Sequence, residues 1–484
     1  LSTSFGDAYD WGNITVEGAA PWVASKKTGE HLNGSQRVIL SNGAVALSGT
    51  PWKTTDGGNI EYGLSANGTT SATQLYFDVN QFKNANITLT TIPSATQVYA
   101  GTSTLGNDVT KNKLSVTGIN VTGKTLYGGY NQSSTGNATN NELVVSGAPA
   151  TSGYNYLYGG YTVNGNATNN TVTLNGYTDP GGWGSSVYGG KSANASADVK
   201  TGNTLKVTAS GNFVNYGVHN FEKMKFVLSS AINSGDVMLS TSFGDAYDWG
   251  NITVEGLDKW VENLTAHGVN KPTLTLSSGS IALQNYVPSL IGNVDDYEFG
   301  KFANTTGTGT VSVSQVSLDG DRFQNATETP TVSGTDIHAG YSKYGNTTNH
   351  NTLNIEETST HVPISYTNAR AGYTKALNGG SDDNTLNLNT GGTVTNGYAG
   401  YTEGMHLLVD PTSKTNPTAV DTTKNADAKN NIVNIKGGTL NAGGKLYGGY
   451  IAPNASLTPP NNVSAGDAKG NTINIENGTF GGST

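Results

Sequence analysis

The residues best suited to chemistry in this chain are its carboxylates, and the most distinctive pair occurs twice. Asp7 and Asp10 share the segment GDAYDWG, and Asp245 and Asp248 share an identical copy. Glycoside hydrolysis uses two carboxyl groups about 5–9.5 Å apart, a separation that residues three apart in a turn can reach. Because both copies carry the pair, we interpret these acids as turn or capping residues, with a cation site or catalysis as alternatives.

Two further groups of acids lie outside the duplicated segment. Asp295, Asp296 and Glu298 are close together, and Asp382 is followed by Asp383. Both groups fall in predicted loops, so we interpret them as solvated acids, although carboxylates beside carbonyls also suit Ca²⁺. The sequence patterns of EF-hand loops and of glycine-rich calcium repeats do not occur. The sequence therefore predicts no catalytic residue, no metal site and no cofactor.

One segment formally matches a phosphate-binding loop. Gly118–Thr125 reads GINVTGKT and satisfies G-x-x-x-x-G-K-[ST]. Such a loop lies between a strand and a helix, because the helix N-terminus and free backbone N–H groups bind the phosphate. Here a repeated strand sequence, Leu126–Tyr130, follows instead of a helix. We therefore predict a turn between strands, with a nucleotide site as the alternative.

The other usual catalytic residue types form no recognisable pattern. There is no cysteine, no G-x-S-x-G serine motif and no H-E-x-x-H histidine pair. The histidines are scattered, and only the fourth to sixth lie near one another, so that stacking of repeats would be needed to bring them together. We expect surface or turn roles for all seven: His31, His219, His267, His338, His350, His361 and His406.

A tyrosine–glycine motif recurs roughly every 30 residues, a period typical of repeat architectures. A column of stacked tyrosines would serve as a packing ladder, and the alternative is an exposed stripe for glycan or protein contacts. The motif occurs as VYAG (Val98–Gly101), LYGGY (Leu126–Tyr130, Leu157–Tyr161 and Leu446–Tyr450), VYGGK (Val187–Lys191), HAGY (His338–Tyr341), RAGY (Arg370–Tyr373) and YAGY (Tyr398–Tyr401).

Most of these motifs are followed by a polar turn and an alternating strand sequence. GNATNN at Gly136–Asn141 precedes such a strand, and so does the copy at Gly165–Asn170. In TVTLNG (Thr171–Gly176) the alternation places Val and Leu on one face. One unit cannot bury that face alone, whereas stacked units bury a continuous core, with asparagine suited to left-handed turns or side-chain ladders. We therefore predict an all-β fold, a right-handed parallel β-helix with coils of about 30 residues.

The chain also contains a long-range duplication. Leu1–Gly18 is repeated without change at Leu239–Gly256, which predicts two tandem homologous modules in one continuous solenoid. The pattern starts and stops in mid-repeat, so we expect a fragment of a longer chain. The predicted boundaries are 1–238 for module 1, with short repeats at about 98–217 and a junction at 218–238, and 239–484 for module 2, with short repeats at about 338–482.

Helical periodicity is confined to one short segment. Leu257, Trp260, Val261 and Leu264 recur at helical spacing, which predicts a short helix near Leu257–Ala266. The counterpart in module 1, Ala19–Lys27, carries Pro21, a residue suited to a first helical turn.

Composition excludes several classes of protein. Charged residues make up 13% of the 484 residues, against about 25% in average globular proteins, and the net charge is −9. Clusters of Lys and Arg that would follow a phosphate backbone are missing, so we expect no nucleic-acid partner. No apolar run approaches the roughly 18 residues of a membrane-spanning helix, so we expect no membrane span. Without cysteine there are neither disulfides nor thiolate chemistry.

Taken together, the repeated LYGGY, GNATNN and TVTLNG units and the segment YGVHNFEKMKFVLSSAINSGDVML (Tyr216–Leu239) resemble a known family. They are similar to the passenger region of large Gram-negative autotransporter (type V secreted) surface proteins. This resemblance implies a right-handed β-helical stalk displayed outside the outer membrane and exported through a C-terminal barrel. Most such passengers resemble adhesins.

Three functional hypotheses follow from these patterns. The first is a non-enzymatic surface stalk or adhesin that binds a protein or glycan through the period-breaking loops Glu403–Asn425 and Ala452–Ala468. The second is a structural subunit of an extracellular filament, favoured by the identical duplicated segments. The third and weakest is a carbohydrate-active β-helix enzyme, because no group of carboxylates stands outside the repeat pattern.

Overall fold

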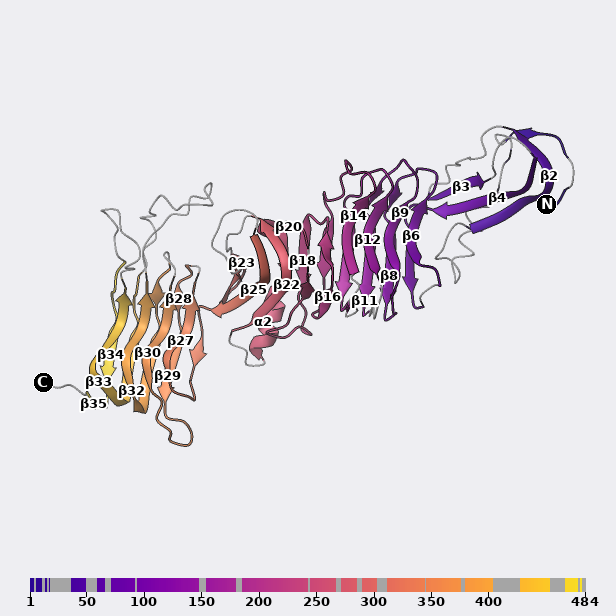
Figure 1. The fold of residues 1–484 in the computed structure, drawn as a ribbon. Helices are drawn as coiled ribbons and strands as arrows, with labels where there is room; N and C mark the ends of the chain where they lie inside the picture. The colour runs from indigo at the N-terminus through magenta and orange to yellow at the C-terminus, as the bar shows by residue number, and fades with distance from the viewer. Residues whose placement is uncertain are drawn as a thin grey trace. The chain divides into compact units, whose positions relative to one another are not determined.

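The computed structural model describes residues 1–3, 6–10, 14, 17, 36–48, 59–65, 71–91, 94–147, 154–179, 185–242, 244–266, 271–284, 290–302, 311–343, 345–375, 379–403, 427–452, 466–477 and 479–480 (Figure 1). They belong to two compact units, which are described separately. Unit 1 comprises Leu1–Gly256, Thr275–Tyr286 and Ala303–Val316, and unit 2 comprises Leu257–Leu274, Val287–Phe302 and Ser317–Thr484.

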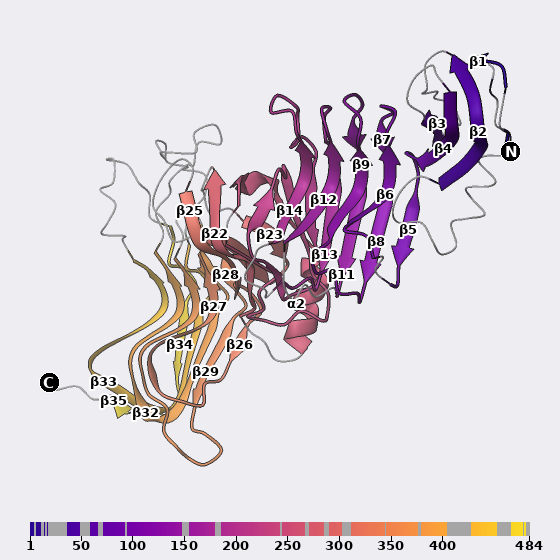
Figure 2. The same cartoon turned by 45° about the vertical axis from the view of Figure 1, so that its right-hand side comes forward.

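Unit 1 is built mainly from two parallel sheets whose strands lie side by side in chain order (Figure 2). Each alternating sequence forms a strand of the first sheet, and each tyrosine–glycine motif forms a strand of the second. The first sheet contains β5 (Asn86–Leu89), β8 (Lys113–Thr117), β11 (Glu142–Ser146), β13 (Thr171–Asn175), β15 (Thr204–Val207), β18 (Lys223–Val227) and β21 (Ile252–Glu255). The second contains β6 (Gln97–Ser103), β9 (Thr125–Asn131), β12 (Asn155–Thr162), β14 (Ser185–Ser192) and β17 (Gly217–His219).

Unit 2 repeats this arrangement with longer strands, because two of them run without a break from the alternating sequence through the tyrosine motif. The parallel partners are β26 (Thr327–Glu328), β27 (Gly334–Ser342), β29 (Thr352–Glu356), β30 (Tyr366–Thr374), β32 (Thr385–Thr402), β33 (Ile432–Ile451), β34 (Thr472–Ile475) and β35 (Thr479–Phe480). The described residues thus form a parallel β-solenoid of about 9 turns with coils of roughly 30 residues, as predicted.

The core lies inside the coils and follows the alternation in the sequence. In β11 the residues Leu143 and Val145 are fully buried, and their neighbours Glu142, Val144 and Ser146 are half-buried. Leu143 pairs with Leu114 in β8 and with Val172 in β13, so like residues stack on like. Fully burying such a side chain contributes about 1.5–3 kcal/mol, and the contribution recurs in every coil.

Each unit also contains an antiparallel hairpin that the uniform repeat pattern did not predict. In unit 1, β3 (Ile60–Ser65) pairs with β4 (Ser71–Gln81), and β4 also pairs with β2 (Gln36–Ser48). In unit 2, β24 (Tyr297–Phe302) pairs with residues 317–322 of β25 (Val311–Arg322). Both hairpins precede the first tyrosine strand of their unit in the chain.

The predicted helix is confirmed as α2 (Leu257–Ala266), the only α-helix in the described part of the chain. Its apolar stripe is buried, and the Trp260 ring lies 6.4 Å from the Phe299 ring. Residues Ala19–Lys27, the counterpart of this helix segment in module 1, lie outside the described residues. None of the helices described has the length and apolar character needed to cross a membrane.

The segment predicted as a junction is part of a sheet. Phe221, Met224 and Phe226 are buried, and β18 pairs with both β15 and β21 in parallel. The parallel pairing of strands in this sheet therefore continues past residue 238. The module boundary at that residue stays a prediction.

Candidate functional site

A column of buried asparagines holds the coils of each unit in register. In unit 1, the side-chain amide of Asn112 donates to Asn141 (2.9 Å), Asn141 to Asn170 (3.2 Å), and Asn170 to Asn203 (3.3 Å). All four are at most 1% exposed. Each amide also donates to a backbone carbonyl, such as Ala138 O for Asn170 (3.0 Å). The predicted asparagine ladder is therefore confirmed.

Unit 2 contains the same asparagine ladder, although the asparagines are unevenly spaced along the chain. Asn351 donates to Asn384 (2.9 Å), Asn384 to Asn431 (3.1 Å), and Asn431 to Asn471 (3.1 Å). These partners are 33, 47 and 40 residues apart in the chain. The ladder keeps its register because the extra residues lie between the strands, where insertions are tolerated.

The residue before each ladder asparagine adopts a left-handed conformation. Asn140 and Asn169 have φ of 56° and 57°, and His350 and Asp383 have φ of 54° at the equivalent positions in unit 2. Asparagine tolerates this region better than most residues because its short polar side chain bonds locally. The first Asn of each Asn-Asn pair therefore makes the turn and the second enters the ladder.

The glycines of the tyrosine motif make room for this ladder. A Cβ placed on Gly129 would lie 2.5 Å from the amide carbon of Asn141, and one on Gly400 would lie 2.6 Å from that of Asn431. Real Cβ atoms do not approach this closely, so the buried asparagine requires glycine opposite it. The motif Tyr-Gly-Gly-Tyr and the turn Asn-Asn thus depend on each other.

The tyrosines on either side of these glycines form two columns of rings in unit 1. Register pairs Tyr127 with Tyr158 and Tyr158 with Tyr188, and consecutive rings stack with centroids 5.1 Å apart. His219 continues the column at 5.0 Å from Tyr188. In the second column the rings of Tyr130 and Tyr161 meet edge to face. Tyr127 and Tyr158 are 4% and 8% exposed, so their faces are covered by neighbouring rings.

Unit 2 changes the first column by placing an arginine within it. Arg370 occupies the tyrosine position of its motif, and its guanidinium carbon lies 4.8 Å from the Tyr373 ring centroid and 4.7 Å from that of Tyr401. It also forms an ion pair with Asp336 at 3.2 Å. The Tyr373 hydroxyl donates to Glu403 at 2.5 Å. The charge of Arg370 therefore lies among aromatic rings and beside an opposite charge.

The tyrosine hydroxyls hold their protons strongly. Burial, with the nearby Tyr130, raises the pKa of Tyr99 to about 12. Burial, with the charges of Asp321, Glu403 and Glu298, raises the pKa of Tyr341 to about 12. The hydroxyls of Tyr99 and Tyr341 are therefore neutral, and the stacked rings pack as the ladder that the sequence favoured.

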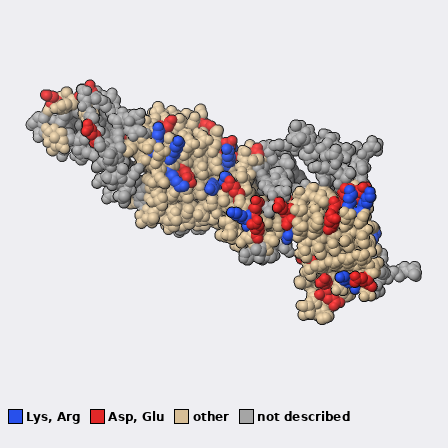
Figure 3. Space-filling model, turned by 180° about the vertical axis from the view of Figure 1, so that it is seen from behind, with Lys and Arg blue, Asp and Glu red and all other residues tan. Residues whose placement is uncertain are grey.

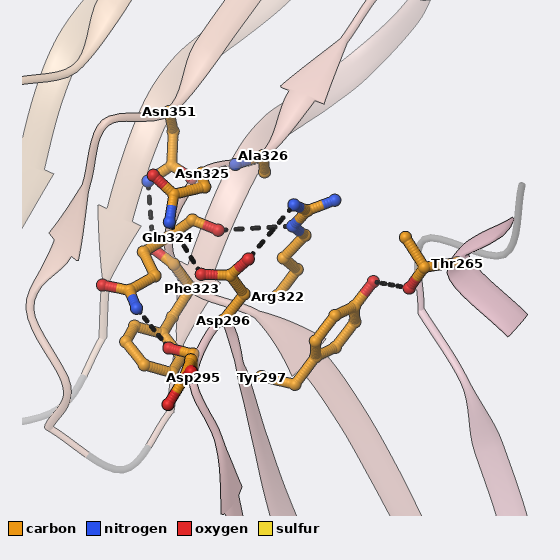
Figure 4. A network of polar contacts seen from close by, with 10 residues as sticks. All are labelled: Thr265, Asp295, Asp296, Tyr297, Arg322, Phe323, Gln324, Asn325, Ala326 and Asn351. Carbon is orange, nitrogen blue, oxygen red and sulfur yellow. Dashed lines mark hydrogen bonds and ion pairs between the residues drawn. The ribbon is translucent and has the colours of Figure 1, made fainter. Parts of the chain in front are cut away.

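The acidic turn of unit 2 is a network of structural contacts (Figure 4). Asp295 is exposed, as predicted, and its carbonyl accepts a bond from Gln324. Asp296 is half-buried, since it pairs with Arg322 at 3.3 Å and accepts from the Asn325 amide at 2.7 Å. In the same view Asn351 reaches Phe323 O at 3.0 Å and so joins this turn to the asparagine ladder.

Three of the acids interpreted as solvated, Asp296, Glu298 and Asp382, are wholly or partly buried. Glu298 is fully buried in β24, so that prediction was wrong, because its strand belongs to the unpredicted hairpin. Asp382 is half-buried and accepts the Lys429 amide at 2.7 Å, and burial raises its pKa although that bond lowers it. Asp383 is exposed at the left-handed turn, as expected.

The duplicated acids have turn roles in the second copy. Asp245 accepts the Asn220 amide at 2.6 Å and lies 3.2 Å from Nδ1 of His219. Burial alone would raise its pKa, but the two hydrogen bonds together with the charges of His219 and Lys200 outweigh burial and lower it. Asp248 accepts the Gly250 amide at 2.7 Å. In the first copy Asp7 and Asp10 are exposed, and Asp10 lies in β1 (Tyr9–Asp10) opposite Ser48.

The segment that matches a phosphate-binding loop is a turn between β8 and β9. Gly118 and Gly123 both have positive φ, and β9 begins at Thr125 without a helix. The Lys124 ammonium donates to the carbonyls of Ser94 (3.1 Å) and Ala95 (2.7 Å). The lysine that would contact phosphate is therefore used to fasten the preceding coil.

Three of the four described histidines are exposed, as expected, whereas His219 is half-buried in β17. His350 and His361 are exposed at left-handed turns, while His219 and His338 extend the ring columns. His31, His267 and His406 lie outside the described residues, and so does almost all of Glu403–Asn425 and Ala452–Ala468. Within the described ranges no three His, Asp or Glu side chains are grouped as a metal site would require.

The face drawn in Figure 3 is mainly uncharged, with Lys and Arg atoms lying next to Asp and Glu atoms. Ion pairs of the structure include Lys113 with Glu142 (2.9 Å) and Lys225 with Glu255 (2.5 Å). Comparison of the chain with family models, curated proteins and solved structures gave no match.

Proposed function

We propose that this chain is a non-enzymatic segment of an extracellular stalk or adhesin, displayed on a Gram-negative cell surface by an autotransporter-like system. One observation carries the proposal: the coils direct their polar and aromatic side chains to the next coil. The asparagine ladders, the tyrosine columns and the core all join neighbours along the stack. Such a chain is suited to hold distant surfaces apart, since each coil needs only its neighbours.

The outer face of unit 2 supports a role as an uncharged spacer. Asn387 donates to Asn354 (2.7 Å), Asn434 to Asn387 (2.8 Å), and Asn474 to Asn434 (2.8 Å). Residues at equivalent positions lie close together in a stack, where like charges would repel. Neutral amides instead satisfy one another, which gives a reason for the low charge of the whole chain.

Ligand binding, in this proposal, comes from the period-breaking loops. Glu403 directly follows the end of β32, and Ala452 directly follows the end of β33. The last residues of these strands, Thr402 and Ile451, are register partners, so the two loops start side by side. Glu403 is held by the Tyr373 hydroxyl, which fixes the start of the first loop on the tyrosine column.

The test is binding of the chain to cultured host cells and to an immobilised glycan array, with and without each loop. A variant in which 404–425 is replaced by a short Gly/Ser link should lose binding and keep its β-rich circular dichroism. The matched control deletes part of the turn between β29 and β30, at Thr358–Thr360. Unchanged binding after both loops are removed would contradict the assignment.

A structural filament subunit is the alternative, and the identical segments Leu1–Gly18 and Leu239–Gly256 favour it. It predicts self-association that grows with protein concentration in light scattering, whereas the adhesin segment is expected to stay monomeric. A carbohydrate-active enzyme would turn over a polysaccharide and lose that activity on combined Asp7→Asn and Asp245→Asn substitution. Such a loss would refute the non-enzymatic proposal.

A further inference from the structure

A buried glutamate joins the hairpin of unit 1 to its first tyrosine strand. Glu61 in β3 is fully buried and accepts five side-chain or backbone donors. They are Asn80 Nδ2 (3.0 Å), Ser103 Oγ (2.7 Å), the Thr104 amide (2.6 Å), Thr104 Oγ1 (3.2 Å) and Asn107 Nδ2 (2.8 Å). Ser103 is the last residue of β6, so the glutamate fastens the hairpin to the end of that strand.

Unit 2 contains the same arrangement. Glu298 in β24 is fully buried and accepts Ser342 Oγ (2.9 Å), the Lys343 amide and Asn346 Nδ2 (2.8 Å). Ser342 is the last residue of β27, and the sequence Ser-x-x-x-Asn recurs from unit 1. We call these two contacts the Glu61 latch and the Glu298 latch.

The two latches differ in the residue on the opposite strand. Glu61 is paired in register with Asn80, which donates to it, whereas Glu298 is paired with Asp321. Asp321 is only 2% exposed. Like charges directly opposite each other on antiparallel strands destabilise the pairing. The Asn80 amide thus strengthens one latch, and the Asp321 carboxylate opposes the other.

The surroundings of Asp321 reduce this repulsion without removing it. Lys271 lies 3.0 Å from one Asp321 oxygen, and Lys343 lies 3.3 Å from the other and 3.7 Å from Asp319. His338 and Tyr341 of β27 also interact with Asp321. The ammonium groups of both lysines bind Asp321, and neither ammonium donates to Glu298. The donors of Glu298 are the Ser342 hydroxyl, the Lys343 backbone amide and the Asn346 side-chain amide.

We propose that the Glu298 latch is a pH-responsive fastening of the unit 2 hairpin, closed when Glu298 is protonated and weakened when it ionises opposite Asp321. This device is independent of whether the chain is an adhesin. Burial raises the pKa of Glu298 above 4.5, the bonds from Lys343, Asn346 and Ser342 lower it in part, and Asp321 raises it further.

The direction of the pH dependence follows from that shift. A carboxyl group whose pKa is higher in the latched state takes up a proton on closing, so latching is strongest below its unlatched pKa. The advantage is lost as pH rises through the pKa of the latched state. Each unit by which the pKa is raised changes the ratio of closed to open latches about tenfold.

The experiment is hydrogen exchange of two backbone amides in the full chain, followed from about pH 4.5 to about pH 7.5 and corrected for the intrinsic exchange rate. The Lys343 amide reports on the Glu298 latch, and the Thr104 amide reports on the Glu61 latch. We expect protection at Lys343 to fall about tenfold per unit of pKa shift as pH rises. Protection at Lys343 that does not fall over this range would overturn the proposal.

Three variants separate the latch from general effects on folding. Asp321→Asn gives unit 2 the pairing found in unit 1, and we expect it to reduce the pH dependence at Lys343. Asn80→Asp makes the reverse change and should create a pH dependence at Thr104. Glu298→Gln removes the titrating group and should leave a flat profile. A steep profile that survives Glu298→Gln would show that another group titrates, and the proposal would fail even if Asp321→Asn did not fold.

Discussion

Replacing Asn170 with alanine removes one rung from the middle of the unit 1 ladder. The Asn170 amide donates to Ala138 O (3.0 Å) and Asn203 Oδ1 (3.3 Å), and its oxygen accepts from the Asn141 backbone amide (2.9 Å). Without it, the buried Asn141 N–H is left unpaired at a cost of about 1–3 kcal/mol, and the two lost donor bonds add about 0.5–1.5 kcal/mol each. We expect the free energy of unfolding to fall by roughly 2–6 kcal/mol.

Urea denaturation followed by circular dichroism measures this change, with the slope m compared to detect local unfolding. The matched control is Asn164→Ala, since Asn164 is exposed and bonds to Ser134 O at 3.0 Å on the surface. That substitution should change stability by no more than about 0.5 kcal/mol. If Asn170→Ala and Asn164→Ala gave the same small loss, the ladder would not hold the coils as argued.

Two further predictions follow from the tyrosine motif. Because burial raises the pKa of Tyr99 and Tyr341 from 10.0 to about 12, the stability that their protonated forms provide is present below pH 10 and lost as pH rises towards 12. Tyrosinate absorbance that developed fully by about pH 10.5 with unchanged circular dichroism would contradict this. Gly129→Ala should destabilise by about 3 kcal/mol or more because its Cβ would lie 2.5 Å from Asn141, whereas Gly147→Ala, with φ of 52° and no atom within 4 Å, should cost only about 1–2 kcal/mol. Equal losses in thermal denaturation would refute the close-approach argument.

The repeated strands could be predicted because their information is local. TVTLNG alternates apolar and polar residues within one strand, and β13 forms there with Val172 and Leu174 buried. The asparagine ladder could also be predicted, since the Asn-Asn pair recurs in the turn of successive coils. Which asparagine of the pair is buried could not be predicted, because Asn140 and Asn141 are the same residue type and only the turn geometry distinguishes them.

The hairpins and their latches were missed for a different reason. Glu61 and Glu298 stand in short segments without a repeat, and an isolated glutamate in a polar segment usually predicts an exposed side chain. Their donors follow 42 and 44 residues later at Ser103 and Ser342. A signal existed in the matching pairs Glu61 with Ser103-x-x-x-Asn107 and Glu298 with Ser342-x-x-x-Asn346, which only a comparison of the two halves reveals.

The sequence by itself determined the period, the positions of the repeated strands, the short helix and the low charge of the stack, because each depends on residue types within one coil. The tertiary structure decided what neighbouring coils do to one another. It placed Arg370 among tyrosine rings, used Lys124 to fasten a turn that resembles a phosphate loop, and buried Glu298 opposite Asp321. These outcomes depend on contacts between residues about 30 or more positions apart in the chain or on facing strands, where burial and charge are set only after the coils have stacked.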